Sequence, residues 1–221
     1  AIALARVAER AAEFGYPRLT ARAGAVPTEE HYIRVLRAAG FEFVKRYARM
    51  RRSLTGVPAT PPEPPPGVSI RLVRADDDVD MRTFFRILDT AFQDTPDHQP
   101  QTYEVWRERV AALPSVPWEE WFVAEVDGEP AGILQSADQA DSNDEGWVKN
   151  LAVLREFRKR GIGAALLATA FAAYARKGRV YAGLGVDLTN PTEAYRLYTS
   201  VGLSASYEAD IFERHVEAAP A

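Results

Sequence analysis

The segment Arg158-Lys159-Arg160-Gly161-Ile162-Gly163 decides the fold expected for this chain of 221 residues. It joins an apolar run at 148–154 to a long stretch with helical spacing at 164–175. The first amides of a helix have no partner within the helix, and the helix dipole places partial positive charge there. Gly161 and Gly163 let the backbone turn its N–H groups inward and let a phosphate approach closely. The segment therefore predicts a site for an anion such as a diphosphate.

Two other phosphate-binding loops do not fit this segment. A Walker A loop requires a lysine followed by serine or threonine, and no such pair follows these glycines. A Rossmann turn requires a third glycine where this chain has Leu166. An ordinary strand-to-helix turn, with Arg155 and the three basic residues of the segment as solvated surface, remains the alternative.

A second pattern follows downstream, with the spacing N-x-x-x-A-x-x-L-Y-x-x-x-G. It comprises Asn190, Ala194, Leu197, Tyr198 and Gly202. Together with the R-x-x-G-x-G loop, this pattern resembles the GCN5-related N-acetyltransferase (GNAT) family over about residues 68–216. The resemblance implies an α/β (α+β) chain with the GNAT fold, in which a mixed, mostly antiparallel sheet contains a central parallel strand pair and is flanked by helices.

The residue patterns predict the order β-α-α-β-β-β-α-β-α-β, which is the order in this family. Asp127-Gly128 between two apolar runs is a strong hairpin signal. The strand–helix–strand unit around the loop should cross over right-handed, which makes its two strands parallel neighbours. The expected strands are 68–74, 121–126, 131–135, 148–154, 180–186 and 204–213, and the expected helices are 79–92, 103–113, 164–175 and 191–201.

A segment with six prolines at 58–67 divides the chain, because proline disfavours both helix and sheet. Upstream of it, a shift of 162 residues pairs Gly40 with Gly202 and repeats the order helix, strand, helix, strand. Tandem arrangements of this kind are known in the family, mycothiol synthase-like proteins among them, and an unrelated helical appendage is the alternative. The expected organisation is a degenerate GNAT-like half at 1–55, a linker at 56–67, a catalytic domain at 68–216 and a tail at 217–221.

Composition excludes several classes of function. The net charge of −4 argues against nucleic acid as a general partner. The absence of cysteine excludes disulfides, thiolate metal sites and a cysteine nucleophile, and the three scattered histidines form no metal-ligand pattern. No apolar run has membrane-spanning length, so we expect a cytoplasmic protein with neither metal nor membrane partner.

The resemblance implies acetyl-CoA as cosubstrate and assigns residues to it. Its pantetheine arm would lie along the backbone of the first parallel strand as a partial strand, and its pyrophosphate would bind the amides of the glycine loop. The resemblance implies that Asn190 contacts the cofactor, although the residues themselves favour a helix-capping role over that contact. The residues expected to bind the cofactor are Leu151, Ala152, Val153, Arg158, Lys159, Arg160, Gly161, Ile162, Gly163, Ala164 and Asn190.

The resemblance also implies the chemistry, in which an amine acceptor attacks the thioester directly. Tyr198 would protonate the leaving thiolate, because a phenol of pKa ~10 is protonated at neutral pH; a core tyrosine is the alternative. Glu145 is the expected general base. Four further carboxylates are open alternatives for that role: Glu119, Glu120, Asp141 and Asp144.

The expected function is therefore acetyl transfer from acetyl-CoA to a primary amine in a ternary complex. A non-catalytic acyl-CoA-binding regulatory module is the first alternative, and a nucleotide-binding domain is the second. The sequence does not identify the acceptor, and it leaves a homodimer open as the assembly.

Overall fold

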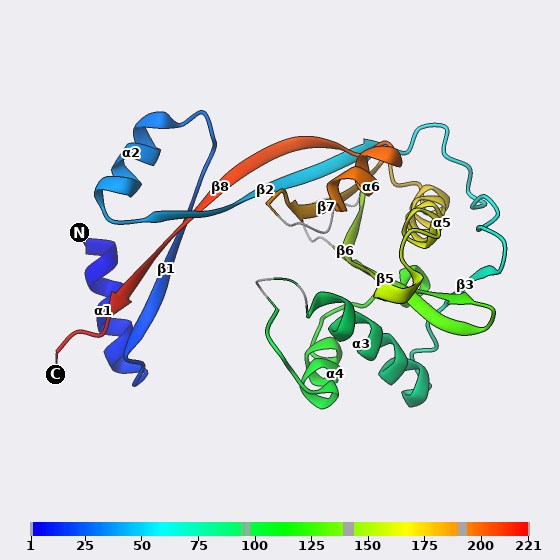
Figure 1. Cartoon of the computed structure of the whole chain (residues 1–221), viewed down its shortest axis with the longest axis horizontal. Helices are drawn as coiled ribbons and strands as arrows, with labels where there is room; N and C mark the ends of the chain where they lie inside the picture. Colours follow the sequence, from blue (N-terminus) through cyan, green and yellow to red (C-terminus); the bar gives the residue numbers. More distant parts are fainter. Residues whose placement is uncertain (1, 94, 96–97, 139–143, 190–193, 221) are drawn as a thin grey trace. The chain divides into compact units, whose positions relative to one another are not determined.

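The computed structural model describes residues 2–93, 95, 98–138, 144–189 and 194–220 (Figure 1). The expected elements are present in the expected order. Two short 3-10 helices, which the sequence patterns do not predict, lie at Trp118–Glu120 and Arg155–Phe157. The helices are α1 (Ile2–Glu13), α2 (Glu30–Ala38), α3 (Asp78–Phe92), α4 (Tyr103–Ala111), α5 (Ile162–Arg176) and α6 (Ala194–Ser200). The strands are β1 (Arg18–Ala25), β2 (Glu42–Ser53), β3 (Val68–Leu72), β4 (Phe122–Val126), β5 (Glu129–Ala137), β6 (Glu145–Val153), β7 (Tyr181–Asp187) and β8 (Ser204–Glu217).

The strands pair in the order β1-β8-β2-β7-β6-β5-β4-β3. Strands β3 to β6 pair antiparallel with their neighbours, and so do β1 and β8. The pair β6–β7 is parallel and is connected through α5. The predicted mixed sheet with a central parallel pair is thereby confirmed.

The chain divides into two compact units, each assembled from separate stretches of sequence. The first contains Ala1–Arg49, Val186–Thr189 and Ala205–Ala221, and the second contains Met50–Gly185 and Asn190–Ser204. The carboxyl-terminal part of β8, Asp210–Glu217, pairs with β1 and so belongs to the first unit. The organisation predicted as 1–55, 56–67, 68–216 and 217–221 stays a prediction. The prediction that residues 1–55 are a degenerate repeat is a statement about shared ancestry, and it stays a prediction.

The first unit has a small core of its own. Ala25, Leu36 and Phe212 are buried together, and Phe41 packs against them. An ion pair between Arg46 and Asp210, with 2.5 Å between Nε and Oδ1, adds to this unit.

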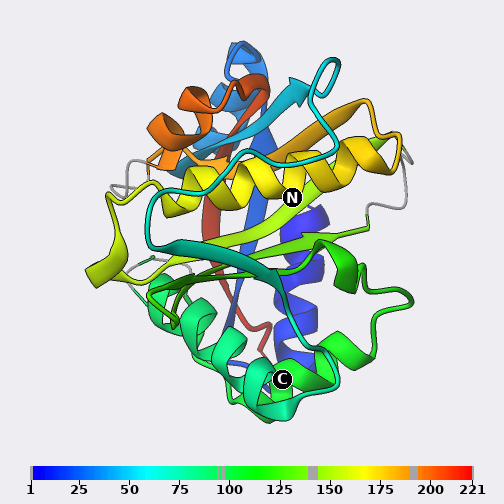
Figure 2. The same ribbon diagram turned by 90° about the vertical axis from the view of Figure 1, so that its right-hand side faces the viewer.

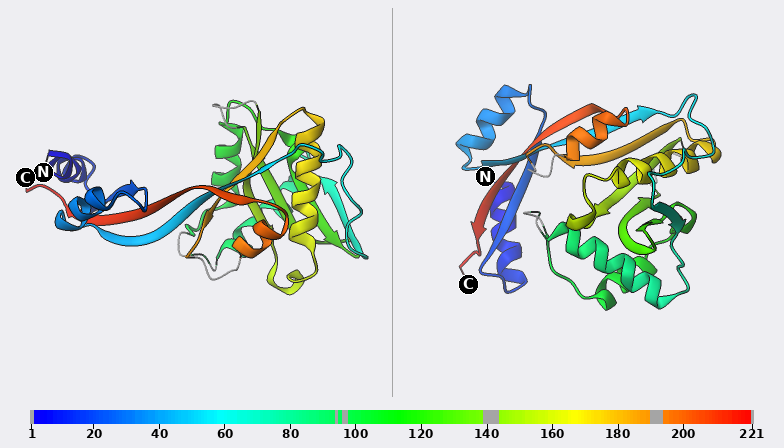
Figure 3. Two further views of the ribbon diagram at one scale, coloured as in Figure 1. Left: turned by 90° about the horizontal axis from the view of Figure 1, so that it is seen from above. Right: turned by 45° about the vertical axis from the view of Figure 1, so that its right-hand side comes forward.

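The second unit is a layered structure in which helices cover both faces of its sheet. Helices α3 and α4 lie on one face and α5 on the other (Figure 2, Figure 3). Leu166, Leu167 and Tyr174 of α5 are fully buried, as expected for a helix that is apolar nearly all round. On the other face, Phe84 of α3 stacks on Trp121 with ring centroids 5.1 Å apart.

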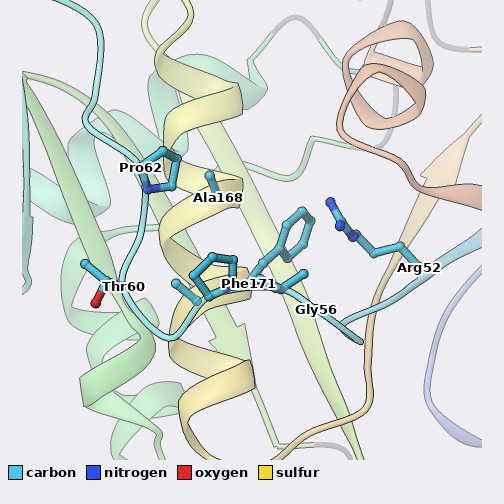
Figure 4. A pocket seen from close by; sticks show the side chains of 9 residues that line it. Arg52, Gly56, Thr60, Pro62, Ala168 and Phe171 are labelled. Carbon is cyan, nitrogen blue, oxygen red and sulfur yellow. The ribbon is translucent and has the colours of Figure 1, made fainter.

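The proline-rich segment belongs to this second unit and packs on α5 (Figure 4). Arg176 Nη1 donates to the carbonyl of Ala59 over 3.4 Å. At the other end of the helix, a methyl group added to Gly161 would lie 3.1 Å from Pro65 Cγ. A cavity of about 250 Å³ remains beneath the segment, beside Phe171. The segment is therefore a packed part of the unit as well as a connection.

A buried carboxylate fixes the start of α3 against the sheet. Asp80 is 2% exposed and pairs with Arg71, with Nη2 and Oδ1 2.7 Å apart. The backbone N–H of Arg74 also donates to it over 2.7 Å. Burial by itself raises the pKa of Asp80, but these hydrogen bonds outweigh burial, so the pKa is lowered.

We expect Asp80→Asn to destabilise the protein by about 1.5–3 kcal/mol, because it removes the buried carboxylate that binds Arg71 and leaves Arg71 with only the partly exposed Glu125. The destabilisation should shrink at acidic pH. A carboxylate with a lowered folded-state pKa stabilises above its unfolded-state value near 4 and loses that contribution as pH falls through the folded-state value. Urea unfolding at several pH values measures this. The exposed Asp76→Asn is the control and should change stability by less than about 0.5 kcal/mol.

Candidate active site

Strand β6 changes its pairing halfway along its length. Its parallel ladder with β7 runs from Glu145↔Tyr181 to Val148↔Leu184. On its other side, consecutive residues of β5 pair with Val148 and Asn150, so Lys149 is an extra residue in β6. Such a β-bulge bends a strand and increases its twist. The bulge therefore coincides with the point where the ladder to β7 ends.

Beyond the bulge, two amides of β6 point away from β5. The N–H of Leu154 donates to Ala131 of the β5 side over 2.9 Å. Successive residues of a strand direct their backbone groups to opposite edges. Leu151 and Val153 therefore direct their N–H groups to the edge on the β7 side, beyond the last parallel pair. The structure thus places these two predicted residues where an extended ligand could add to the strand. Ala152 has a buried side chain, and its own amide points toward β5.

The turn after β6 has the geometry of an anion-binding loop. Arg158 Nε donates to the carbonyl of Val153 over 3.1 Å and folds the turn back on the strand. Lys159 and Gly161 both have left-handed backbone conformations, with φ of 63° and 77°. Left-handed residues in such a turn create a concave group of N–H donors. Helix α5 begins directly afterwards, at Ile162.

The start of α5 concentrates positive charge. The amides of Ile162, Gly163 and Ala164 precede the first helical hydrogen bond, which Ala165 N–H donates to the Gly161 carbonyl over 3.0 Å. The first turn contains no acidic residue, and no side chain among the described residues caps it. The adjacent Lys159 and Arg160 are exposed cations. A bound anion would balance this charge.

Helix α6 lies beside the first turn of α5. A methyl group added to Gly163 would meet Leu197 Cδ2 of α6 at 2.9 Å and Leu151 Cδ2 of β6 at 4.0 Å. The structure thus brings together β6, α5 and α6 at Gly163. Tyr198, the predicted acid, is the next residue after Leu197.

Tyr198 is half-buried, and burial raises the pKa of its phenol to about 12. The side chain is therefore protonated at neutral pH, as a general acid must be. Asn190, the other residue predicted on this side, lies outside the described residues, as does the alternative base Asp141.

Glu145, the predicted base, lies at the start of β6, before the bulge. Its side chain is 3% exposed and forms an ion pair with Arg51, with 3.5 Å between Oε1 and Nε. Arg51 in turn stacks on the ring of Tyr181 at 3.4 Å. A methyl group at Gly183 would overlap Glu145 Oε1 at 2.3 Å, so this glycine makes room for the carboxylate. The base role of Glu145 stays a prediction.

The alternative bases have other partners. Glu120 is fully buried and pairs with Arg179, with 2.8 Å between Oε2 and Nη1. Lys177 contacts both Glu119 and Glu120 at 2.5 Å. The backbone carbonyl of Asp144 accepts from Val180 N–H over 2.8 Å. Both Glu119 and Glu120 pair with basic residues that follow the end of α5, which favours a structural role for these two carboxylates.

Two features of the site are not apparent from the sequence patterns. The bulge at Lys149 depends on pairing with β5, and no local signal marks it. The contact of Pro65 with Gly161 joins residues far apart in the chain. The concentration of prolines at 58–67 was the available signal, but it predicted only a spacer.

We expect Gly161→Ala to lower the affinity for coenzyme A at least about tenfold. The substitution places a side chain in a left-handed position, which costs about 1–2 kcal/mol, and it also crowds Pro65. Isothermal titration calorimetry measures the affinity. Gly128→Ala is a matched control, since Gly128 has φ +84° and nothing within 4 Å of an added methyl. It should lose similar stability but bind coenzyme A within about twofold of the parent; equal affinities in both variants would contradict the loop assignment.

No helix in the described ranges is long and apolar enough to cross a membrane. In the same ranges, no group of three or more histidine or acidic side chains is arranged to hold a metal ion.

Solved structures with a similar fold are numerous. A GCN5-related N-acetyltransferase from Sphaerobacter thermophilus has a TM-score of 0.79 at 24% identity, covering 96% of this chain and 65% of that one. A tandem GNAT protein from the clavulanic acid biosynthesis pathway has a TM-score of 0.68 at 16% identity, covering 98% and 69%. A GCN5-related N-acetyltransferase from Kribbella flavida has a TM-score of 0.59 at 20% identity, covering 91% and 70%. The chain thus spans about two thirds of the length of these proteins.

No protein with a curated description matches the sequence. The family model described as the acetyltransferase (GNAT) family matches residues 81–203, which is more than half of the chain and includes β6, the glycine loop, α5 and α6. The chain belongs to the GNAT acetyltransferase family.

Proposed function

We propose that this chain transfers an acetyl group from acetyl-CoA to a primary amine by direct attack in a ternary complex. Membership of the GNAT family supports acetyl transfer from acetyl-CoA in general. The observation that carries the proposal is the cationic start of α5, with left-handed Lys159 and Gly161, next to the open edge of β6.

In this proposal the backbone binds both ends of the cosubstrate. The amides from Lys159 to Ala164 hold the pyrophosphate, and Arg158 and Arg160 add charge. The N–H groups of Leu151 and Val153 hold the pantetheine arm and polarise the thioester carbonyl. These donors are set by the strand and the helix before the ligand arrives, so they stabilise developing negative charge without rearrangement.

The chemical step forms a C–N bond and breaks the C–S bond of the thioester. The amine attacks the carbonyl carbon and loses a proton to Glu145 or to a water that Glu145 orients. The thiolate of coenzyme A leaves and takes a proton from Tyr198. Alignment of two reactants supplies about 7–11 kcal/mol and an oxyanion donor about 3–4 kcal/mol, whereas a general acid contributes about 10²–10⁴-fold in rate. Positioning is therefore the larger effect.

The upstream elements support a tandem organisation like that of mycothiol synthase-like proteins. Moved by 162 residues, β1 falls at 180–187 and β2 at 204–215, where the chain has β7 (Tyr181–Asp187) and β8 (Ser204–Glu217). We place the reaction in the cytoplasm, as expected from the sequence.

One observation favours a second candidate, a non-catalytic acyl-CoA-binding module. The carboxylate of Glu145 is buried in an ion pair with Arg51, and a base must reach the proton that it removes. Release of coenzyme A thiol in the presence of a panel of amines separates the two candidates. A binding module would show normal coenzyme A affinity and no amine-dependent release.

We expect Tyr198→Phe to lower kcat about 100-fold, with coenzyme A affinity within about twofold of the parent, because the phenol acts on the leaving group only. Burial raises the pKa of Tyr198 to about 12. The phenol therefore stays protonated up to about pH 10, and its ionisation should not lower kcat of the parent enzyme below that pH. Steady-state kinetics of thiol release measures both. Tyr195→Phe, which changes an exposed tyrosine of the same helix, is the control. Unchanged kcat in Tyr198→Phe would refute the acid role.

Glu145→Gln tests the base separately. If Glu145 is the base, we expect kcat/KM for the amine to fall about 100-fold and its dependence on pH to lose the limb of an essential base. If the carboxylate serves only the pair with Arg51, the free energy of unfolding falls and that limb persists. Kinetics over pH and urea unfolding together distinguish the two outcomes.

A further inference from the structure

Gly161 and Gly163 are glycines for different physical reasons. Gly161 has a left-handed backbone, which disfavours any side chain. Gly163 lies within α5 and is not among the residues with positive φ. A methyl group added to Gly163 would lie 2.9 Å from Leu197 Cδ2. This distance is shorter than an ordinary contact between two carbon atoms. An alanine at this position therefore requires the end of the Leu197 side chain, or α6 with it, to shift.

Leu197 of α6 thus lies against the first turn of α5 at Gly163. Helix α6 is short, from Ala194 to Ser200, and a helix of this length depends on tertiary contacts for its position. Its carboxyl end is fixed separately, where Arg52 donates to the carbonyl of Val201. The contact at Gly163 therefore fixes α6 near its middle.

Leu197 and Tyr198 are consecutive, so their side chains point about 100° apart around one helix axis. A rotation or shift of α6 that relieves a clash at Leu197 necessarily moves the phenol of Tyr198. Since a misplacement of about 1 Å can lower a rate about 100-fold, this geometry links the fit at Gly163 to the position of the acid.

We propose that Leu197 is a positioning residue, whose contact with Gly163 sets the position of Tyr198 relative to the glycine loop at residues 158–163. The proposal rests on the proposed role of Tyr198 as general acid. The absence of a side chain at Gly163 then serves catalysis through packing, and not through a close approach of the diphosphate.

The test is a double-mutant cycle on the full chain. Gly163→Ala should lower kcat for thiol release about 10- to 100-fold, while calorimetric affinity for coenzyme A changes less than about threefold. Shortening the opposing side chain should relieve the clash, so Gly163→Ala/Leu197→Ala should recover at least about tenfold of that loss. Gly24→Ala in β1, with only an ordinary contact at 3.8 Å, controls for the substitution itself.

The second arm repeats Gly163→Ala in the Tyr198→Phe background. There it should lower kcat less than about threefold, because the acid is already absent. An equal loss in both backgrounds, or no recovery in the Gly163→Ala/Leu197→Ala variant, would overturn the proposal. A normal kcat in Tyr198→Phe alone would instead refute the acid role. A large loss of coenzyme A affinity in Gly163→Ala would assign this glycine to ligand approach.

A readout independent of the acceptor is the tyrosine Cζ resonance of Tyr198, assigned by its absence in Tyr198→Phe. It should move in Gly163→Ala and return toward its original position when Leu197 is also shortened. An unmoved resonance would show that the contact does not position Tyr198.

Discussion

The site depends on one electrostatic constraint, the cationic start of α5. Free amides of the first turn, a positive dipole end and the basic residues from Arg158 to Arg160 lie together, and no acidic residue of that turn balances them. Such an arrangement is unfavourable in isolation and favourable with a diphosphate in place. The bulge at Lys149 lies in β6 beside this turn, and Leu197 of α6 lies against its first residues at Gly163, so the proposed acid Tyr198 lies on the same side as the proposed anion site.

The fold and the loop could be predicted because their signals are local. The glycines, the basic residues and the alternation of apolar residues lie within short stretches, and the observed β6, α5 and β7 begin within a few residues of the expected bounds. The family pattern through Leu197 and Tyr198 identified α6 in the same way. Helix α5 begins two residues earlier than expected, which places Gly163 inside its first turn.

The remaining features depend on residues that are distant in sequence. The partner of Glu145 is Arg51, from a strand that precedes the proline segment, and nothing near Glu145 predicts that pair. The sequence predicted Glu145 as the base without indicating its surroundings, and in the structure its side chain is 3% exposed. Likewise, Pro65 lies close enough to Gly161 to meet a methyl group added there, although the prolines predicted only a spacer. The pairing of β8 with β1, which places the end of the chain in the first compact unit, also cannot be deduced from the periodicity of either strand.

The raised pKa of Tyr198 sharpens the question of how a thiolate could be protonated. Transfer from a phenol of pKa about 12 to a thiolate whose conjugate acid is near 8.5 would be uphill by about 5 kcal/mol if the thiolate were in water. Burial, however, raises the pKa of any acid whose charged form is the anion, thiols included. A thiolate released beside Tyr198 would share its desolvated surroundings, so part of the mismatch cancels. The cancellation requires both groups to lie in the same environment, which makes the placement of α6 on α5 matter more than the intrinsic acidity of the phenol.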